Sequence, residues 1–159
     1  MMHNWFTCKI RYEKTMENGM QKKVTEPYLV DALSFTEAES RIIEEMTPFF
    51  QGEFVVAGVA RANYEEIFPS DEEFADRWFK CKLWFITLDE KSGAEKRTAS
   101  NVLVQASDLR DAIKKLDEGM KDTLADYVIA SVAETAIMDV YPYEADPDVK
   151  PEFNDADRR

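Results

Sequence analysis

The sequence predicts an α+β protein: two β-β-α-β repeats form a two-layer sandwich, with one mostly antiparallel sheet and two helices on one face. Three observations support this prediction. WFTCKIRY (residues 5–12) and WFKCKLWF (residues 78–85) carry Trp, Phe, Cys and Lys at the same offsets, 73 positions apart. A glycine-bearing turn follows each phrase, and an amphipathic stretch follows each turn. One such repeat has too little apolar surface to be stable alone, so we expect the two copies to share a core.

The first half is predicted to run strand, strand, helix, strand. After the strand at 5–12, the turn around Gly19 leads to a second strand in YLVDALS (residues 28–34). The helix is expected in FTEAESRIIEEM (residues 35–46), where Ser34 and Glu37 fit a capping box. EFVVAGVARANYEEIFP (residues 53–69) closes the half with a further strand.

The second half is predicted to repeat this order. A turn around Gly93 separates the strand at 78–85 from VLVQAS (residues 102–107). A helix is expected in DLRDAIKKLDEGM (residues 108–120), with Ser107 or Asp108 as its N-cap. The closing segment, YVIASVAETAIMDVYP (residues 127–142), matches the first half again at an offset of 73.

These patterns predict a single pseudo-twofold domain over residues 1–143. Repeat 1 spans residues 5–68, a linker spans 69–77, and repeat 2 spans 78–141. The remaining residues, 144–159, are acidic, contain prolines and have few apolar side chains. We therefore expect them to form a flexible tail.

The twin Trp-Phe-x-Cys-Lys strands, the turns that pair glycine with EK or KK, and DVYPY at residues 139–143 resemble a known family. It is catalogued as domain of unknown function 4494 and occurs in Bacteroides-group bacteria and their phages. The resemblance covers roughly residues 5–143. It implies no particular activity and no catalytic residues.

The charge of this chain is unevenly distributed. The formal net charge is −12, which disfavours nucleic acid as a general partner because phosphates repel an acidic surface. However, residues 5–25 carry five basic side chains against two acidic ones, and residues 77–98 carry six against three. The repeated phrase therefore lies in the basic part of the chain.

Composition also predicts where the protein works. The sequence contains no apolar run of the ~20 residues that a membrane span needs, and its first residues lack the pattern of a signal peptide. Its only cysteines, Cys8 and Cys81, cannot build a disulfide framework and fit a reducing compartment. We expect a cytoplasmic protein without a membrane partner.

The residue inventory argues against an enzyme. The only histidine, His3, stands at the N-terminus, the cysteines have no metal-binding spacing, and no glycine-rich phosphate loop occurs. The remaining candidates are carboxylates that bind a divalent metal, but such pairings arise by chance in a chain with 32 acidic residues. They are Glu65, Glu66, Glu134 and Asp139. We therefore predict no catalytic residues, no metal site and no cofactor.

Strand alternation predicts a binding face. In each of the two repeated strands, every second residue counted from the cysteine is apolar or aromatic. We place these residues on the sheet face beneath the helices. The other set mixes tryptophan with lysine or arginine on a face that no predicted element covers. The candidate binding residues are Trp5, Lys9, Arg11, Trp78, Lys80, Lys82 and Trp84.

Two kinds of partner fit such a face. Tryptophan and arginine are typical of protein interfaces, so we predict binding to another protein or self-association as a homodimer. Aromatic rings among cations also suit single-stranded nucleic acid, because bases stack on the rings and cations follow the backbone. A third alternative is that the acidic tail covers the face and nothing else binds there.

Overall fold

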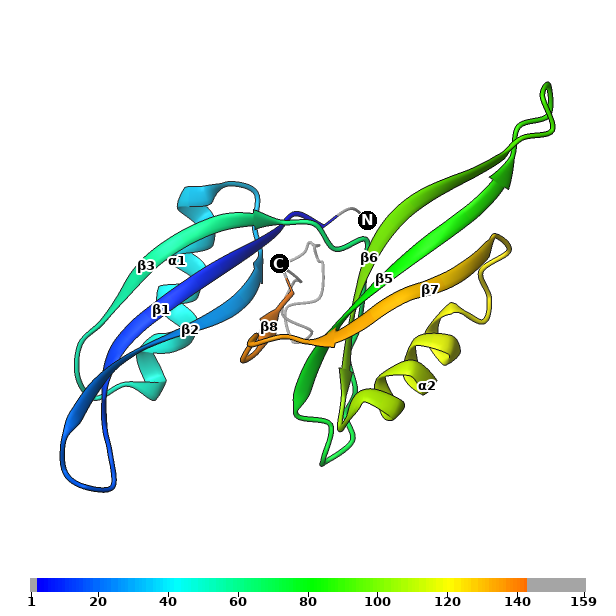
Figure 1. Cartoon of the computed structure of the whole chain (residues 1–159). Helices are drawn as coiled ribbons and strands as arrows, with labels where there is room; N and C mark the ends of the chain where they lie inside the picture. The colour runs from blue at the N-terminus through cyan, green and yellow to red at the C-terminus, as the bar shows by residue number, and fades with distance from the viewer. Residues whose placement is uncertain (1–2, 143–159) are drawn as a thin grey trace, which may run out of the picture. The chain divides into compact units, whose positions relative to one another are not determined.

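The computed structural model describes residues 3–142, and this part of the chain has a mixed α+β fold. It contains eight strands in two sheets, two α-helices and one short 3-10 helix (Figure 1). In chain order these are β1 (Trp5–Thr15), β2 (Gln21–Asp31), α1 (Phe35–Met46), η1 (Thr47–Phe49), β3 (Phe54–Ala62), β4 (Glu66–Phe68), β5 (Arg77–Leu88), β6 (Glu95–Ala106), α2 (Leu109–Met120), β7 (Asp126–Glu134) and β8 (Val140–Tyr141). The tail at 144–159 lies outside the described residues.

The prediction of one shared sheet is wrong. The chain divides into two compact units, each with its own four-stranded sheet. The second unit spans Ala62–Asp139, while the first runs to Arg61 and takes up the chain again at Val140. In each sheet a short fourth strand, β8 or β4, pairs with part of an edge that one repeat alone leaves open.

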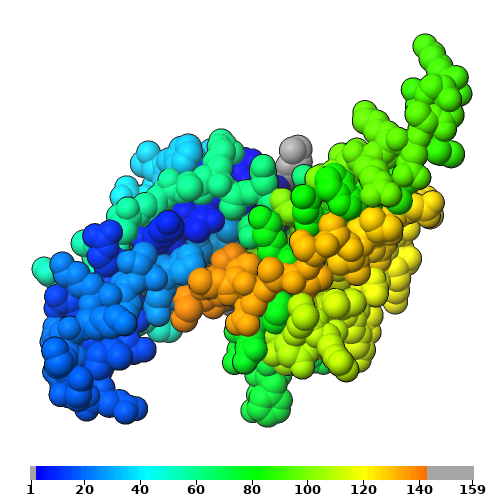
Figure 2. Space-filling view, in the orientation of Figure 1, coloured from blue at the N-terminus to red at the C-terminus, as the bar shows by residue number. Residues whose placement is uncertain are grey.

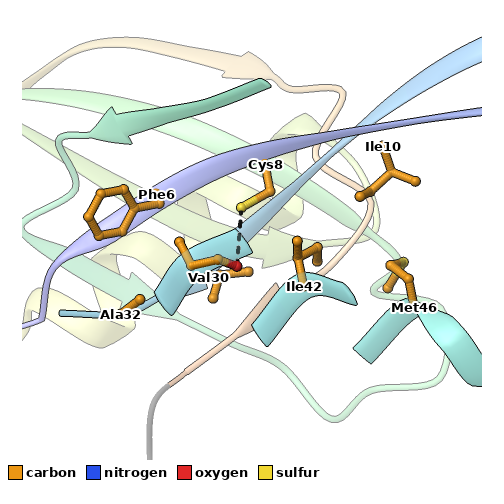
Figure 3. Packing of buried hydrophobic residues seen from close by; sticks show 8 residues of the cluster. Phe6, Cys8, Ile10, Val30, Ala32, Ile42 and Met46 are labelled. Atoms are coloured by element: carbon orange, nitrogen blue, oxygen red, sulfur yellow. Dashed lines mark hydrogen bonds between the residues drawn. The ribbon is translucent and has the colours of Figure 1, made fainter. Parts of the chain in front are cut away.

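In the first unit the strand order is β3-β1-β2-β8. β1 and β2 form an antiparallel hairpin with Trp5 opposite Asp31 and Thr15 opposite Gln21. Helix α1 packs its buried side chains on one face of this sheet, where the core also contains the repeated cysteine (Figure 3). The buried cluster consists of Phe6, Cys8, Ile10, Val30, Ala32, Ala38, Ile42 and Met46.

In the second unit the strand order is β4-β6-β5-β7, and β5 is antiparallel to both of its neighbours. Helix α2 covers one face, where Leu116 and Met120 pack against Cys81, Leu83 and their neighbours. The hairpin β5–β6 is long, and in Figure 2 its tip projects beyond the rest of its unit. Figure 1 shows the same hairpin as two extended strands.

Each sheet takes its short strand from the other half of the sequence. β4 follows β3 in the chain but pairs in parallel with β6, so that Ile67 lies opposite Leu103. β8 follows β7 but pairs in parallel with β2, so that Val140 lies opposite Leu29. The boundaries of the units therefore differ from the predicted boundaries of the repeats.

The hairpin turns and helix starts agree with the sequence analysis. Gly19 and Gly93 both have positive φ, which glycine adopts without steric cost. The hydroxyl of Ser34 accepts the N–H of Glu37 at 3.1 Å, which confirms the predicted cap of α1. In α2 the cap is Asp108, whose carboxylate accepts the N–H of Asp111 at 2.8 Å.

A basic side chain on each helix reaches the chain just after a short strand. Arg41 of α1 donates to the carbonyl oxygen of Pro142 at 3.3 Å, directly after β8. Lys115 of α2 donates to the hydroxyl of Ser70 at 3.1 Å and pairs with Glu72, shortly after β4. These contacts hold the short strands in the sheets they complete.

Within residues 3–142, no helix has the length and apolar character that crossing a membrane requires.

Candidate binding surface

The apolar faces of the two central strands were assigned correctly. Cys8 and Ile10 are buried beneath α1, and Cys81 and Leu83 are buried beneath α2. The basic side chains between them point to the opposite face of each sheet, because alternate residues of a strand point in opposite directions. The pattern of residues thus predicted the direction of each side chain.

The prediction that Trp5 and Trp78 are exposed is wrong. Their exposed fractions are 6% and 3%, although both lie on the helix-free faces. Leu29, which shares the face of Trp5, is buried as well, and so is Leu103, which shares the face of Trp78. Alternation identifies the face on which a side chain lies, but it does not tell whether that part of the face is covered.

The remaining candidate residues divide between the two units. Lys9 and Arg11 are exposed on β1 of the first unit, opposite Pro27 and Thr25 of β2. Lys80 is exposed on β5 of the second unit, where Lys82 and Trp84 are half-buried. The structure therefore brings together Lys80, Lys82 and Trp84 on one sheet face and Lys9 with Arg11 on another.

The second unit presents the more developed surface. The ammonium nitrogen of Lys82 lies 4.7 Å from the centroid of the Trp84 ring, within the range of a cation–π interaction. Trp84 lies opposite Val128 of β7, whose side chain is 42% exposed, and Ile86 continues the same face opposite Arg97. We call this surface the Trp84 face; it consists of Lys80, Lys82, Trp84, Ile86, Arg97 and Val128.

Sequence reasoning missed the apolar part of the Trp84 face. Ile86 lies just beyond the repeated phrase, and Val128 belongs to the closing segment of the second half, which was not predicted to be part of the binding face. Alternation along residues 126–134 was the available signal, because it places Val128 opposite to the buried side of that strand. Its pairing with Trp84 requires the sheet order, which periodicity does not give.

In the first unit, Arg11 borders a pocket of about 580 Å³. The pocket lies where the β1–β2 hairpin passes the start of β3, and its lining mixes both signs of charge with aromatic residues. The lining residues are Arg11, Tyr12, Glu13, Gln21, Lys23, Gly52, Glu53, Phe54 and Val55.

The cysteines have the environment of core residues. Both are free thiols and fully buried, and the sulfur of Cys8 points to the carbonyl oxygen of Ala38 at 3.9 Å (Figure 3). Burial raises the pKa of each thiol to about 11, and for Cys8 the nearby charge of Glu39 adds to the effect. Thiols with such pKa values carry almost no thiolate at neutral pH.

The carboxylates named by sequence reasoning do not gather in one place. Glu134 forms an ion pair with Arg77 at 3.7 Å, while Glu65 and Glu66 border a pocket beside β4. Across residues 3–142, no group of three or more His, Cys, Asp or Glu side chains is arranged to hold a metal ion.

His3 contacts Asp31, and its ring stacks on Trp5 with 5.3 Å between ring centroids.

Comparison with known proteins identifies the family. The profile described as Domain of unknown function (DUF4494) matches residues 4–143. The chain belongs to this family. The match runs from the start of β1 past the end of β8, so the family's domain includes both units rather than one. A search of curated proteins returned no match.

Proposed function

We propose that this member of the family is a non-enzymatic binding protein that binds another protein through the Trp84 face. The observation that carries the proposal is the arrangement around Trp84: a half-buried aromatic ring with the exposed Val128 beside it and lysines next to it. An aromatic and aliphatic centre within a charged rim is the usual composition of a protein interface. The cations Lys80 and Lys82 favour a partner with an acidic surface, whereas Arg97 is paired with Glu95 at 3.3 Å.

Self-association is one form of this function. The chain is strongly acidic outside its two basic segments, so a second copy offers the charge that the Trp84 face attracts. A homodimer and an acidic partner protein use the same residues, and they differ in whether the isolated chain forms dimers.

Single-stranded nucleic acid is the second candidate partner. The basic side chains on the Trp84 face favour it, because they can follow a phosphate backbone. Two observations make it the weaker candidate. Lys82 already lies over the Trp84 ring, and Trp5 and Trp78 are buried rather than available for stacking.

We also infer that the two halves of the chain, residues 5–68 and 78–141, are copies of one β-β-α-β unit. The order of elements and the pairing register support this inference. Trp5 lies opposite Asp31 in one hairpin, and Trp78 lies opposite Gln105 in the other. The second turn is one residue longer, which accounts for a change of offset from 73 to 74 before the helices.

Two expectations rest on the sequence alone and stay predictions. The expectation of a cytoplasmic location rests on the low cysteine content. The origin in Bacteroides-group bacteria or their phages rests on the resemblance to the family.

Trp84 itself provides the first test of the proposed function. Trp5 and Trp78 are buried, so a quencher in solution acts mainly on Trp84 fluorescence. If the chain self-associates through this face, quenching should fall as protein concentration rises, and light scattering should detect a dimer that Trp84→Ala abolishes. Phe74→Ala is the matched control, because Phe74 is also exposed and lies outside the Trp84 face.

A different partner protein is tested by crosslinking. A photo-crosslinking residue at position 84 should capture a partner in cells, and the same residue at position 74 should not. The purified partner should then bind the full chain, and Trp84→Ala should weaken binding by at least ~30-fold, as expected for an interface hot spot. Equal capture at both positions, or unchanged affinity of Trp84→Ala, contradicts the proposal.

A labelled single-stranded oligonucleotide distinguishes the second candidate. Binding that protects Trp84 from the quencher and weakens steeply with salt would favour nucleic acid, because cations released from phosphates drive such binding. For a protein-binding face we expect no effect of the oligonucleotide, even at low salt.

A further inference from the structure

A second pocket lies on the helix side of the second unit, away from the Trp84 face. Its volume is about 440 Å³. It lies beside the start of β4 and the end of α2, over the parts of β5 and β6 that α2 does not cover. The lining residues are Glu65, Glu66, Phe85, Thr98, Ala99, Ser100, Val102, Met120 and Thr123.

Ser100 is a buried polar residue in this pocket whose hydroxyl lacks a partner. Its exposed fraction is 9%, and it lies opposite Leu83, which places it on the helix side of the sheet. Among residues 3–142 its hydroxyl makes no hydrogen bond. Buried hydroxyls are almost always hydrogen-bonded, either to protein or to water, so this hydroxyl is available to a molecule that occupies the pocket.

The charge in the pocket is negative. Two of the nine lining residues are glutamates and none is basic. The N–H of Glu65 donates to the carbonyl oxygen of Asn101 at 2.8 Å, which fixes this acidic segment against β6. Helix α2 also ends here at Met120, and the C-terminal end of a helix carries partial negative charge.

The remaining walls are apolar. Phe85 of β5, Val102 of β6 and Met120 of α2 belong to or pack against the core of the unit. A ligand that fits the pocket therefore needs an uncharged, apolar stem and a positively charged donor at one end. Anions are disfavoured by the two glutamates, and a fully polar cation leaves the apolar walls without a contact.

We propose that this pocket binds a primary alkylammonium group. The alkyl stem packs against Phe85, Val102 and Met120, and the ammonium lies by Glu65 and Glu66 and donates a hydrogen bond to the hydroxyl of Ser100. An ammonium has three N–H donors, so it can contact both glutamates and the serine. A free alkylamine and a lysine side chain present the same group.

The test is a titration of the ¹⁵N-labelled full chain with n-pentylamine, followed by NMR. Backbone signals around residues 65–66, 98–102 and 120–123 should shift and saturate. Two molecules of similar size are matched controls: 1-pentanol lacks the charge, and pentanoate reverses it. We expect 1-pentanol to bind about tenfold more weakly, since two carboxylate–ammonium contacts at a partly exposed site are lost, and pentanoate not to bind.

Variants separate the pocket from general charge. The double variant Glu65→Gln/Glu66→Gln should weaken pentylamine binding about tenfold. Glu90→Gln, in the β5–β6 turn, keeps the pocket intact and should not change it. Ser100→Ala should weaken binding while leaving the Tm of the free protein unchanged or higher, because no hydrogen bond is lost in the fold.

The two sources of the ammonium are separated by a lysine derivative with both backbone ends blocked, Nα-acetyl-lysine-N-methylamide. Shifts with this probe as well as with pentylamine indicate a site that accepts lysine side chains, whereas shifts with pentylamine alone indicate a site for free amines. Equal binding of pentylamine and 1-pentanol, or binding that none of the pocket variants changes, overturns the proposal.

Discussion

At the residue scale, the clearest role in the repeated phrase is that of its two cysteines, Cys8 and Cys81. Each lies in the core of its own unit, on the strand face that packs against the helix. Composition and alternation were sufficient to predict that the cysteines are buried, because a small apolar side chain on an apolar strand face is most stable in the core. The neighbouring tryptophans were less predictable, since an amphipathic ring is stable both in a core and at a surface.

The thiols predict a loss of stability at alkaline pH. Their pKa is about 11 in the folded chain, against 9.0 for an ordinary thiol. The unfolded chain therefore releases the thiol protons at lower pH than the folded chain does. The contribution of the protonated thiols to the free energy of unfolding is complete below pH 9 and is lost as pH rises towards 11. Urea unfolding at a series of pH values should show this decline.

The matched variant is Cys8→Ala/Cys81→Ala. Burial also raises the pKa of Tyr12, Tyr64 and Tyr127, which gives a decline of the same sign. The double variant should keep the tyrosine part and lose the thiol part, so its stability should fall less steeply between pH 9 and 11. Identical slopes for both proteins would contradict the role given to the thiols.

At the scale of elements, the docking of α2 depends on a strand from the other half of the sequence. Lys115 contacts Ser70, Glu72 and Asp111, and its side chain is mostly buried. Burial alone would lower the pKa of Lys115, but its hydrogen bonds to Glu72 and Asp111 and their charges raise it. The N–H of Ser107 and the Lys115 ammonium in turn lower the pKa of Asp111, so this group of charges is mutually stabilising.

Gly119 gives a prediction about the same contact. A Cβ added there would lie 2.8 Å from ring atoms of Phe68 in β4, closer than side chains can approach. Alanine normally stabilises a helix by ~1 kcal/mol relative to glycine, but here the phenylalanine ring has to move. We expect Gly119→Ala to lower the free energy of unfolding by roughly 1–2 kcal/mol, measured by urea denaturation.

A second substitution identifies the cause. Phe68→Leu removes ring atoms that meet the added methyl group, so Gly119→Ala should cost less in the Phe68→Leu background than in the natural chain. If the two substitutions are simply additive, or if Gly119→Ala is stabilising, the packing of β4 against α2 does not require glycine.

The long elements were predictable from sequence and the short ones were not. Helix α1 begins after Ser34 and buries Ala38, Ile42 and Met46. Both features were predictable, because the capping residue and the four-residue spacing of the apolar side chains lie within the helix segment itself. β4 and β8 have three and two residues, and a strand of that length carries no periodicity. Their partners, β6 and β2, are set by contacts between distant parts of the chain.

At the scale of the whole molecule, each half of the sequence gives a short strand to the sheet of the other half. The sequence can therefore be divided in two ways, into repeats or into compact units. Repeats defined by similarity end near residues 68 and 141, whereas the compact units change over after Arg61 and after Asp139. The residues in between carry the short strands from one half to the sheet of the other. Similarity along the sequence could not reveal this, because the copies match equally well whichever sheet each short strand joins.

The two divisions predict different behaviour for fragments of the second unit. A fragment of residues 62–139 contains all four strands of its sheet, the helix α2, and the contacts of Lys115 with Ser70 and Glu72. A fragment of residues 77–159 follows the repeat instead and lacks β4, which leaves the edge of β6 and the side of α2 uncovered.

We expect the first fragment to give a dispersed NMR spectrum and a cooperative urea transition. The second should be less stable by several kcal/mol, because a small domain has little stability in excess. Adding a peptide of residues 62–76 to the second fragment should restore part of the difference. Equal stability of the two fragments would mean that β4 is not an essential part of this unit.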